Sequence, residues 1–325
     1  MTYRFLVTTT SLGQGGRELL AEAGCVVDYL DDANDVAEVE QRMSSVAYDA
    51  VISRTVELNA KAINACPTLK IICKHGVGVT NIDVAAATER GIPVLTTPAT
   101  NAQSVAELTL ALMLNCARRL PYFQQEVAAG RWTRSGDGEE LQGKTLGLIG
   151  FGEIGRRVAR FASVIGMQVA FFDPAAPADG DFEGAQRCDS LDDLLPLADV
   201  LSLHCPVTPK TRLMINAQRL AKLPAHATLI NTARGELIDE EALAAALQSG
   251  QLRAAALDTV TLEPLAADHP FRALSNLIVT PHIGGSTPQA LDAVAQSAAR
   301  QCLAFLDTQQ INPSACVNPQ VLNRS

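Results

Sequence analysis

Three side chains that can act together on a carbonyl compound each follow a strand-like stretch of the sequence. Arg234 lies in "LINTARGELIDEEAL", Glu263 in "LDTVTLEPL" and His282 in "VTPHIGGST". An arginine can bind a carboxylate through two parallel hydrogen bonds and polarise a carbonyl. A histidine exchanges a proton near neutral pH, and a neighbouring carboxylate orients its ring. With a hydride donor, these groups are the equipment for interconverting a 2-hydroxy acid and a 2-keto acid.

A glycine motif earlier in the chain is suited to holding that hydride donor. In "LGLIGFGEIGRRVARFA", Gly150 permits a tight turn, Gly152 lets a pyrophosphate approach the backbone, and Gly155 lets the following helix pack closely. An ordinary strand–turn–helix can show the same glycines, but here a second strand, "MQVAFFD", ends in Asp173. A carboxylate at that point accepts hydrogen bonds from ribose hydroxyls and repels a 2′-phosphate, so the sequence favours NAD over NADP.

Strand-like and helix-like runs alternate along the whole chain, which is typical of parallel sheets with helices on both faces. The carboxyl ends of the strands line the ligand site in such sheets, so Arg234, Glu263, His282 and the glycine motif are expected at one edge. The residues at 133–140 and 174–189 are expected to form loops. The predicted strands are 4–9, 25–30, 49–54, 69–74, 92–97, 145–151, 167–173, 199–205, 227–232, 254–260 and 276–282, and the predicted helices include 15–23, 35–43, 58–65, 83–91, 103–119 and 287–307.

The composition of the chain limits the kinds of molecule that it is expected to bind. The 325 residues are enough for two domains, and 47% of them are hydrophobic, so a full core can form. A net charge of −9 argues against nucleic acid or an anionic membrane, but it leaves room for a small anionic substrate. The eight cysteines show no CxxC spacing, so we expect no metal site and reduced thiols in a cytoplasmic protein. We see no signal-peptide pattern and no apolar stretch of membrane-spanning length.

A second glycine-containing stretch, "KHGVGVTNID" at 74–83, has a different pattern from the nucleotide motif. Its glycines suit a loop whose backbone N–H groups bind an anion. From the residues alone, a plain strand-to-helix turn is an equally good interpretation.

The ordered motifs together resemble the D-isomer-specific 2-hydroxyacid dehydrogenase family, in its phosphoglycerate-dehydrogenase-like branch. The resemblance rests on residues 150–155, 231–239, 258–264 and 280–287 and continues through "TTPATNAQSVAELTLALML", "LHCPVTPKTRLMIN" and "VNPQVL". It implies an α/β fold of two doubly wound parallel-sheet domains. A Rossmann NAD domain of residues 99–283 would be inserted in a flavodoxin-like substrate domain of residues 1–98 and 284–325. We also expect a homodimer.

The resemblance also implies roles for individual residues. Arg234 would bind the substrate carboxylate and keto oxygen, His282 would be the acid/base, and Glu263 would be its partner. Val77 and Gly78 would present backbone N–H groups to the substrate carboxylate. The family often has Asp where this chain has Thr80. The expected contacts with NAD are Gly150, Gly152, Glu153, Ile154, Gly155, Asp173, His204, Cys205, Pro206, Thr211, Thr232, Ala233, Asp258 and Gly284, and the expected substrate contacts are Arg54, Lys74, Val77, Gly78, Arg234 and His282.

Other polar residues have two open interpretations. His204 contacts the cofactor or serves the fold, and His75 touches substrate or merely adjoins the 74–83 loop. Four cations, Arg54, Lys74, Arg131 and Arg134, are suited to a substrate phosphate but equally to the solvated surface. His226 and His269 lie in predicted turns, where solvated histidines are expected.

Two functions from different classes fit the sequence. The first is an NAD-dependent oxidoreductase that interconverts a D-2-hydroxy acid and its 2-keto acid, of the phosphoglycerate dehydrogenase or the hydroxypyruvate/glyoxylate reductase kind. The second is an NAD(H)-sensing binding protein on the same fold with little turnover. The presence of Arg234, Glu263 and His282 together favours the enzyme.

Overall fold

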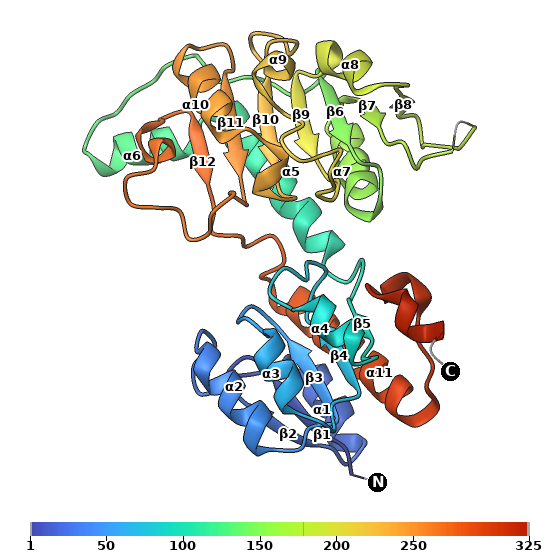
Figure 1. The fold of residues 1–325 in the computed structure, drawn as a ribbon. Coiled ribbons are helices and arrows are strands. Elements are labelled where there is room, and N and C mark those ends of the chain that lie inside the picture. Colours follow the sequence, from blue (N-terminus) through green and yellow to red (C-terminus); the bar gives the residue numbers. More distant parts are fainter. Residues whose placement is uncertain (1, 178, 324–325) are drawn as a thin grey trace. The chain divides into compact units, whose positions relative to one another are not determined.

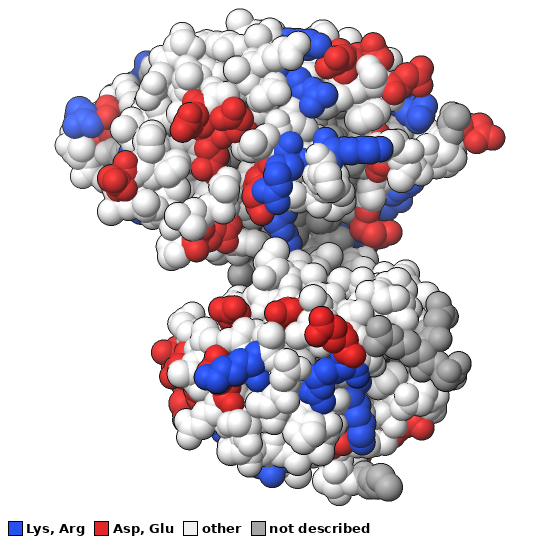
Figure 2. Space-filling view, viewed as in Figure 1, with Lys and Arg blue, Asp and Glu red and all other residues white. Residues whose placement is uncertain are grey.

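The computed structural model describes residues 2–177 and 179–323, and the chain divides into two compact units. Unit 1 consists of residues 1–101 and 286–325, and unit 2 of residues 102–285. Each unit is built around its own parallel sheet (Figure 1). Figure 2 shows Lys and Arg side chains intermixed with Asp and Glu on the drawn face of both units.

The sheet of unit 1 has five parallel strands in the order β2-β1-β3-β4-β5. In sequence they are β1 (Arg4–Val7), β2 (Val26–Tyr29), β3 (Ala50–Ser53), β4 (Ile71–Lys74) and β5 (Val94–Leu95). The direction of chain progression reverses between β1 and β3. In open α/β sheets, this switch point is where ligands bind, outside the carboxyl ends of the strands.

Alternate residues of these strands enter two different cores. Phe5 and Val7 of β1 pack with α1 (Gln14–Glu22) and α11 (Pro288–Thr308), whereas Leu6 faces the opposite core. That opposite core is covered by α2 (Val36–Ser45), α3 (Ala60–Ala65) and α4 (Val84–Glu89). Asp35, Asn59 and Asp83 cap these three helices by accepting backbone N–H bonds. Strands β1, β3, β4 and β5 are therefore buried on both faces, which explains their continuous apolar runs.

Helices α1 and α11 approach each other closely because glycines occupy the contact. A Cβ atom at Gly16 would lie 2.7 Å from the Ala295 Cβ and 2.9 Å from its carbonyl carbon. The Asp292 Oδ1 accepts the Gly15 N–H at 2.6 Å and so helps to satisfy the first turn of α1. The start of α1 is thereby fixed against α11.

The sheet of unit 2 has seven parallel strands in the order β12-β11-β10-β9-β6-β7-β8 (Figure 1). They are β6 (Thr145–Ile149), β7 (Gln168–Phe172), β8 (Gln186–Arg187), β9 (Val200–Leu203), β10 (Thr228–Asn231), β11 (Ala254–Leu257) and β12 (Leu277–Val279). One face packs against α5 (Ala102–Arg118) and α7 (Glu153–Val164), and the other against α8 (Leu191–Leu194), α9 (Ala217–Leu220) and α10 (Glu240–Gln248). This is the Rossmann arrangement that the glycine motif predicts.

Short elements complete the two units. Helix α6 (Leu120–Ala128) follows α5, and the 3₁₀ turns are η1 (Leu195–Leu197), η2 (Gly235–Leu237), η3 (Pro270–Ala273), η4 (Pro313–Ala315) and η5 (Pro319–Asn323). Within the described residues, no helix has both the length and the apolar character that crossing a membrane requires.

The structure confirms the α/β fold and all eleven predicted strands, each trimmed by one or more residues. Most of the predicted strand residues that lie outside the observed strands follow their carboxyl ends, where they begin the loops that carry polar groups. Strand β8 was wrongly assigned to the 174–189 loop, because two polar residues at a sheet edge give no hydrophobic signal. Four helices, α6, α8, α9 and α10, were not predicted.

The C-terminal segment is joined to the edge of the unit 1 sheet by a buried asparagine. The Asn318 Oδ1 accepts the Val94 N–H at 2.8 Å, and its Nδ2 donates to the Ile92 carbonyl at 2.9 Å. Val317 N donates to the Val94 carbonyl at 2.9 Å beside this contact. Residues distant in sequence thus complete one sheet edge.

Replacement of Asn318 with Ala should destabilise unit 1, because a backbone N–H and a carbonyl would remain buried without partners. We expect the free energy of unfolding to fall by about 2–4 kcal/mol in urea titrations followed by circular dichroism. The matched control is Gln320→Ala at an exposed position of the same segment. Equal midpoints for the two variants would show that Asn318 does not hold the segment.

Candidate active site

The glycine loop after β6 is shaped for a dinucleotide. Gly150 has φ 95°, and a Cβ there would lie 2.5 Å from the His204 carbonyl oxygen. A Cβ at Gly155 would lie 2.3 Å from the Gly150 carbonyl oxygen. Gly152 differs, because a Cβ there would enter open space, and Gly152 caps α7 without a side-chain hydrogen bond. Two glycines thus permit close packing, while the third leaves backbone N–H groups of the helix start open to a phosphate.

An aspartate at the end of β7 lies directly against this loop. The Asp173 Oδ2 accepts the Phe151 N–H at 2.8 Å, and its Oδ1 accepts the Ala175 N–H at 2.8 Å. The carboxylate is therefore held in place, half-buried, on the strand next to the glycine loop. That position matches the acid that binds the ribose hydroxyls in dinucleotide sites, so the residues fit NAD.

His204, at the end of β9, contributes a buried neutral imidazole beside Gly150. Burial lowers the pKa of His204 to about 3, and its Nε2 lies 2.9 Å from the Ser202 Oγ. The Nδ1 atom is buried without a hydrogen-bond partner among the described residues. A buried polar atom without a partner costs free energy that a bound ligand can recover. His204 thus serves the fold through Ser202 and leaves one nitrogen available.

The loop that follows His204 is braced internally. The Thr211 Oγ1 donates to the Pro206 carbonyl at 2.7 Å and accepts the Thr208 N–H at 2.7 Å. Burial raises the pKa of the Cys205 thiol to about 11, so the thiol is protonated at neutral pH. These hydrogen bonds fix the backbone of residues 206–211.

Arg234 is presented on a turn that a buried amide holds. The Asn231 side chain donates from Nδ2 to the Arg234 carbonyl at 2.8 Å and accepts the Ala233 N–H at Oδ1 at 2.9 Å. The Thr232 Oγ1 lies 2.9 Å from the Thr109 Oγ1 of α5, which anchors the same turn. The Arg234 guanidinium is half-buried, and its Nη1 donates to the Ala233 carbonyl at 2.6 Å.

Gly235 brings the arginine turn against the loop that carries Glu263. A Cβ at Gly235 would lie 2.1 Å from the carbonyl carbon of Val260 and 2.3 Å from the Thr261 nitrogen. Backbone atoms cannot yield this space, so only glycine fits between the two loops. The loop after β10 and the loop after β11 are therefore held in contact.

Glu263 and His282 form a pair. The His282 Nδ1 lies 2.9 Å from the Glu263 Oε2, and the Glu263 Oε1 accepts the Val260 N–H at 3.2 Å. The side chains are 46% and 40% exposed, so both are open to a ligand. With Nδ1 directed at a carboxylate, Nδ1 carries the proton and Nε2 is the free nitrogen in the neutral ring. The pair can therefore exchange a proton through Nε2.

Asp258 organises the backbone on which His282 lies. This carboxylate is 1% exposed, and its Oδ1 accepts from the Thr280 Oγ1 at 2.6 Å and the Ile283 N–H at 2.8 Å. Its Oδ2 accepts the Gly284 N–H at 2.8 Å, and its carbonyl accepts the His282 N–H at 2.9 Å. His282 itself has φ 55°, a left-handed conformation that histidine adopts more readily than most residues.

In unit 1, the 74–83 loop has the features of an anion-binding backbone. Gly76 has φ 139°, donates its N–H to the Thr97 Oγ1 at 3.0 Å and accepts the Thr97 N–H at 2.9 Å. The N–H groups of Val77 and Gly78 have no hydrogen-bond partner within the described part of the chain. The anchored Gly76 therefore presents two free donors in succession.

Lys74 and Arg54 are joined to each other. The Lys74 ammonium is buried and donates to the Arg54 carbonyl and to the Asn81 Oδ1. The Asn81 Nδ2 donates to the Val56 carbonyl at 2.8 Å. The Arg54 N–H binds the Thr8 Oγ1 at 2.9 Å, while its half-buried guanidinium lines a cavity. Lys74 thus supports the backbone of Arg54.

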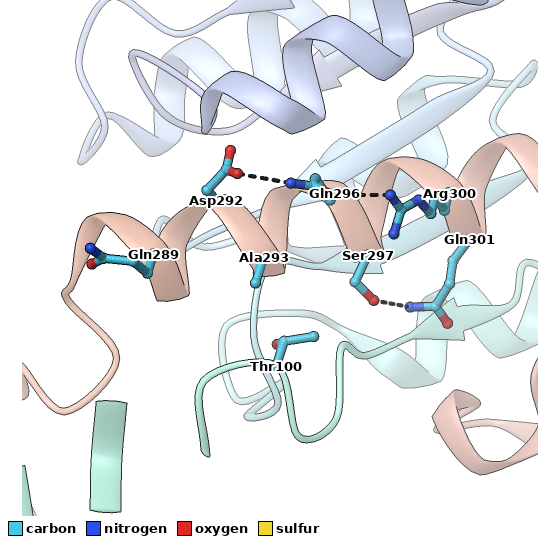
Figure 3. A pocket seen from close by; sticks show the side chains of 8 residues that line it. All are labelled: Thr100, Gln289, Asp292, Ala293, Gln296, Ser297, Arg300 and Gln301. Carbon is cyan, nitrogen blue, oxygen red and sulfur yellow. Dashed lines mark hydrogen bonds between the residues drawn. The ribbon is translucent and has the colours of Figure 1, made fainter. Parts of the chain in front are cut away.

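Two cavities of unit 1 adjoin α11. One, of about 720 Å³, lies at the switch point and is lined by Arg54 and His75. The other, of about 620 Å³, lies beside Thr100 (Figure 3). Its wall is a ladder of polar contacts along α11, where Asp292 binds Gln296 and Gln296 binds Arg300.

Three of the four remaining candidates have their own partners within unit 2. The exposed Arg131 pairs with Glu126, and Arg134 is exposed. His226 lies 2.5 Å from Asp199 and His269 lies 3.5 Å from Glu240, so neither is simply solvated as expected. No group of three or more His, Cys, Asp or Glu within 2–177 and 179–323 is arranged to hold a metal ion.

Sequence reasoning missed several residues that position this site. Asn231, Gly235 and Glu240 are the clearest, since the Glu240 Oε1 accepts the Thr261 N–H at 2.7 Å beside the Glu263 loop. The glycine immediately after Arg234 and the acid at the start of α10 were visible signals. Neither residue predicts a site by itself, because glycine is common in turns and glutamate is common in the first turn of a helix.

Comparisons with known proteins agree with this geometry. Residues 110–284 match the model of the family described as "D-isomer specific 2-hydroxyacid dehydrogenase, NAD binding domain". The chain is 39% identical to D-3-phosphoglycerate dehydrogenase of Methanocaldococcus jannaschii over 299 residues, 91% of this chain and 56% of that protein. It is 43% identical to hydroxypyruvate reductase of Thermotoga maritima over 243 residues, 74% of this chain and 78% of that protein.

Solved structures give the same result. The TT0316 protein of Thermus thermophilus superimposes with a TM-score of 0.85 at 36% identity, covering 97% of this chain and 99% of that one. The chain spans little more than half the length of the Methanocaldococcus relative. The family match over more than half of the chain, its NAD-binding domain and the identity to these relatives establish that the chain belongs to the D-isomer-specific 2-hydroxyacid dehydrogenase family.

Proposed function

We propose that the protein interconverts a D-2-hydroxy acid and its 2-keto acid with NAD. The observation that carries this proposal is the His282–Glu263 pair, held at 2.9 Å on the sheet edge that also bears the glycine loop and Arg234. Such a pair is suited to moving a proton to or from an oxygen atom. The named relatives, a dehydrogenase and a reductase, support the enzyme over a binding protein.

The NAD-binding role falls to residues 99–283, and the substrate-domain role to residues 1–98 and 284–325. The family's NAD-binding match at 110–284 supports this division. The N–H groups at Gly152, Glu153 and Ile154 would hold the pyrophosphate, and Asp173 the ribose. When bound, the nicotinamide supplies or accepts the hydride. The other proposed contacts with NAD are His204, Cys205, Pro206, Thr211, Thr232, Ala233, Asp258 and Gly284, and the last two also hold the backbone around His282 through the bond from the Gly284 N–H to Asp258.

Two sets of donors are suited to a substrate carboxylate. The free N–H groups of Val77 and Gly78 are suited to one carboxylate, and the Arg234 guanidinium can bind a carboxylate and polarise the neighbouring keto oxygen. Lys74 holds the Arg54 carbonyl and so helps to position Arg54, and direct contacts of Lys74 and Arg54 with the substrate remain part of the proposal.

His282 is the proton donor in the reductive direction and the acceptor in the oxidative direction. Because Nδ1 is held by Glu263, the proton is exchanged at Nε2. Glu263 keeps the ring in the required tautomer and orientation. The exposed fractions of both side chains leave Nε2 accessible to a small substrate.

The direct test follows NADH oxidation at 340 nm with glyoxylate, pyruvate, hydroxypyruvate, 3-phosphohydroxypyruvate and 2-ketogluconate. Turnover of at least one acid supports the proposal, and for every acid except glyoxylate, whose product is achiral, the D-2-hydroxy acid should be recovered on chiral chromatography. Tight NADH binding without turnover of any of them would favour the binding protein.

Glu263→Gln should impair the reaction because both carboxylate oxygens accept hydrogen bonds. A glutamine amide must direct its NH₂ at the Val260 N–H or at the His282 Nδ1, which disturbs the loop or selects the wrong tautomer. We expect kcat/KM to fall about 10²- to 10³-fold, and His282→Ala to cost about 10²- to 10⁴-fold.

The double variant separates a functional pair from two independent residues. If Glu263 acts through His282, Glu263→Gln combined with His282→Ala should be no slower than His282→Ala alone. NADH affinity, measured by fluorescence titration, should stay within about threefold of wild type throughout. Fully multiplicative losses would mean that the two residues act separately.

We further propose that the protein is a cytoplasmic homodimer. Helix α6 has no buried residue although much of it is apolar, and Leu120 and Val127 are 51% and 54% exposed. Leu114 and Trp132, nearby in sequence, are 39% and 77% exposed. Apolar surface of this kind is typical of an interface. All eight cysteines are free thiols, which supports a reducing compartment.

Sedimentation velocity tests the dimer. Wild-type protein should sediment at about twice the monomer mass at micromolar concentration, and Leu120→Glu with Val127→Glu should shift it to the monomer because charges are costly at an apolar interface. Val164→Glu, at an exposed position on α7, is the control. A monomeric wild type would refute the dimer.

A further inference from the structure

Three phenylalanine rings from different segments of unit 2 form one aromatic cluster, which consists of Phe151, Phe171 and Phe182. Phe151 and Phe171 are buried, and their rings stack with 3.9 Å between the centroids and 16° between the planes. The Phe182 ring meets both of them edge to face, with its centroid 4.7 Å from that of Phe171 and 5.8 Å from that of Phe151. Edge-to-face contacts contribute to stability beyond the burial of apolar area, so the three rings hold one another in place.

Two members of the aromatic cluster belong to the part of unit 2 that is shaped for a dinucleotide. Phe151 lies between Gly150 and Gly152, and Phe171 lies on β7 two residues before Asp173. The Asp173 Oδ2 accepts the Phe151 N–H at 2.8 Å. The residue that carries one ring is therefore bound to the carboxylate that follows the other ring. A shift of Phe151 would displace the glycine loop and disturb its bond to Asp173.

The third ring comes from outside the glycine motif. Phe182 lies in the segment that joins β7 to β8 and is half-buried. A Cβ atom at Gly180 would lie 2.7 Å from the Phe182 Cζ, so the same segment packs closely on this ring. The Ala185 N–H donates to the Phe182 carbonyl at 3.0 Å and closes the turn that follows. The ring therefore contacts both its own segment and the other two rings of the cluster.

An ion pair attaches the same segment to α7. The Arg160 Nε and Nη2 donate to the two carboxylate oxygens of Glu183 at 2.7 and 2.6 Å. The two side chains are 59% and 56% exposed, and exposed ion pairs contribute little because water and salt screen them. The ring of Phe182 is therefore expected to attach this segment to the glycine loop more strongly than the ion pair does.

We propose that Phe182 is a positioning residue for NAD, which acts through Phe151 and Phe171 on the glycine loop and on Asp173. The inference rests on the proposed NAD contacts and adds to them a residue from a different segment. Removal of the ring would leave a gap beside Phe151 and Phe171, and neighbouring side chains relax partly into such a gap. Because the pyrophosphate needs fixed N–H groups and the ribose a fixed carboxylate, a displaced loop should bind the adenosine half of NAD more weakly.

Phe182→Ala tests the proposal by ligand binding. We expect the Kd for NADH, measured by fluorescence titration, to rise about five- to twentyfold. The Kd for ADP-ribose, measured by isothermal titration calorimetry, should rise by the same factor, because ADP-ribose contains the pyrophosphate and the adenosine but no nicotinamide. Phe182→Leu, which keeps apolar volume without the ring, should raise both values about threefold. At saturating NADH, kcat should stay within about threefold of wild type, because the His282–Glu263 pair is not altered.

Phe161→Ala is the matched control for the loss of a ring. Phe161 is half-buried against the same core, on α7, and within the described residues its ring has no contact with the three rings of the aromatic cluster. The control should lower the melting temperature about as much as Phe182→Ala does, while both Kd values stay within about twofold of wild type. A residue with a purely structural role would give this second pattern.

Hydrogen exchange of the protein without NAD measures the glycine loop itself. Amides in peptides that cover residues 149–154 should exchange at least about threefold faster in Phe182→Ala than in Phe161→Ala. Kd values of both Phe182 variants within twofold of those of Phe161→Ala would overturn the inference and leave the proposed function intact. Failure of the wild-type protein to bind either NADH or ADP-ribose would instead remove the proposed NAD contacts, and the inference with them.

Discussion

The buried carboxylate of Asp258 is the interaction on which the geometry of the site depends most. It accepts from three donors in residues 280–284, and its own carbonyl accepts the His282 N–H. Without these bonds, the chain after β12 has little reason to turn back with His282 in a left-handed conformation. One side chain at the end of β11 therefore decides where His282, the proposed acid/base residue after the neighbouring strand, lies.

The same principle recurs around the sheet edge: buried groups fix the backbone, and the reactive side chains stay open. Asn231 holds the Arg234 turn, Gly235 lets that turn touch the Glu263 loop, and Glu240 binds the Thr261 N–H. The glycine loop for NAD is packed by two glycines and left open at the third. Preorganisation of this kind lets binding energy act on the reacting groups and not on ordering the loops.

Much of this architecture was predictable from the sequence. The inner strands are buried on both faces, so their apolar runs are distinct in the sequence. The polar residues that follow them fall at one edge of each sheet by topology alone. Helix α6 gave no such signal, because no residue of it is buried in the chain. The partners of individual side chains could not be predicted either. Lys74 donates to the Arg54 carbonyl and the Gly284 N–H donates to Asp258, and only the folded chain brings these groups close.

The central claim is that Asp258 places His282 for proton transfer, and Asp258→Asn tests it most directly. The variant keeps the size of the side chain but turns an NH₂ toward a backbone N–H that the carboxylate accepts in the native loop. The control is Asp268→Asn, an exposed site between β11 and β12. For enzyme shown to be folded by circular dichroism, we expect kcat/KM to fall at least about 10²-fold, with NADH affinity nearly retained. Activity of Asp258→Asn within twofold of Asp268→Asn would contradict the claim.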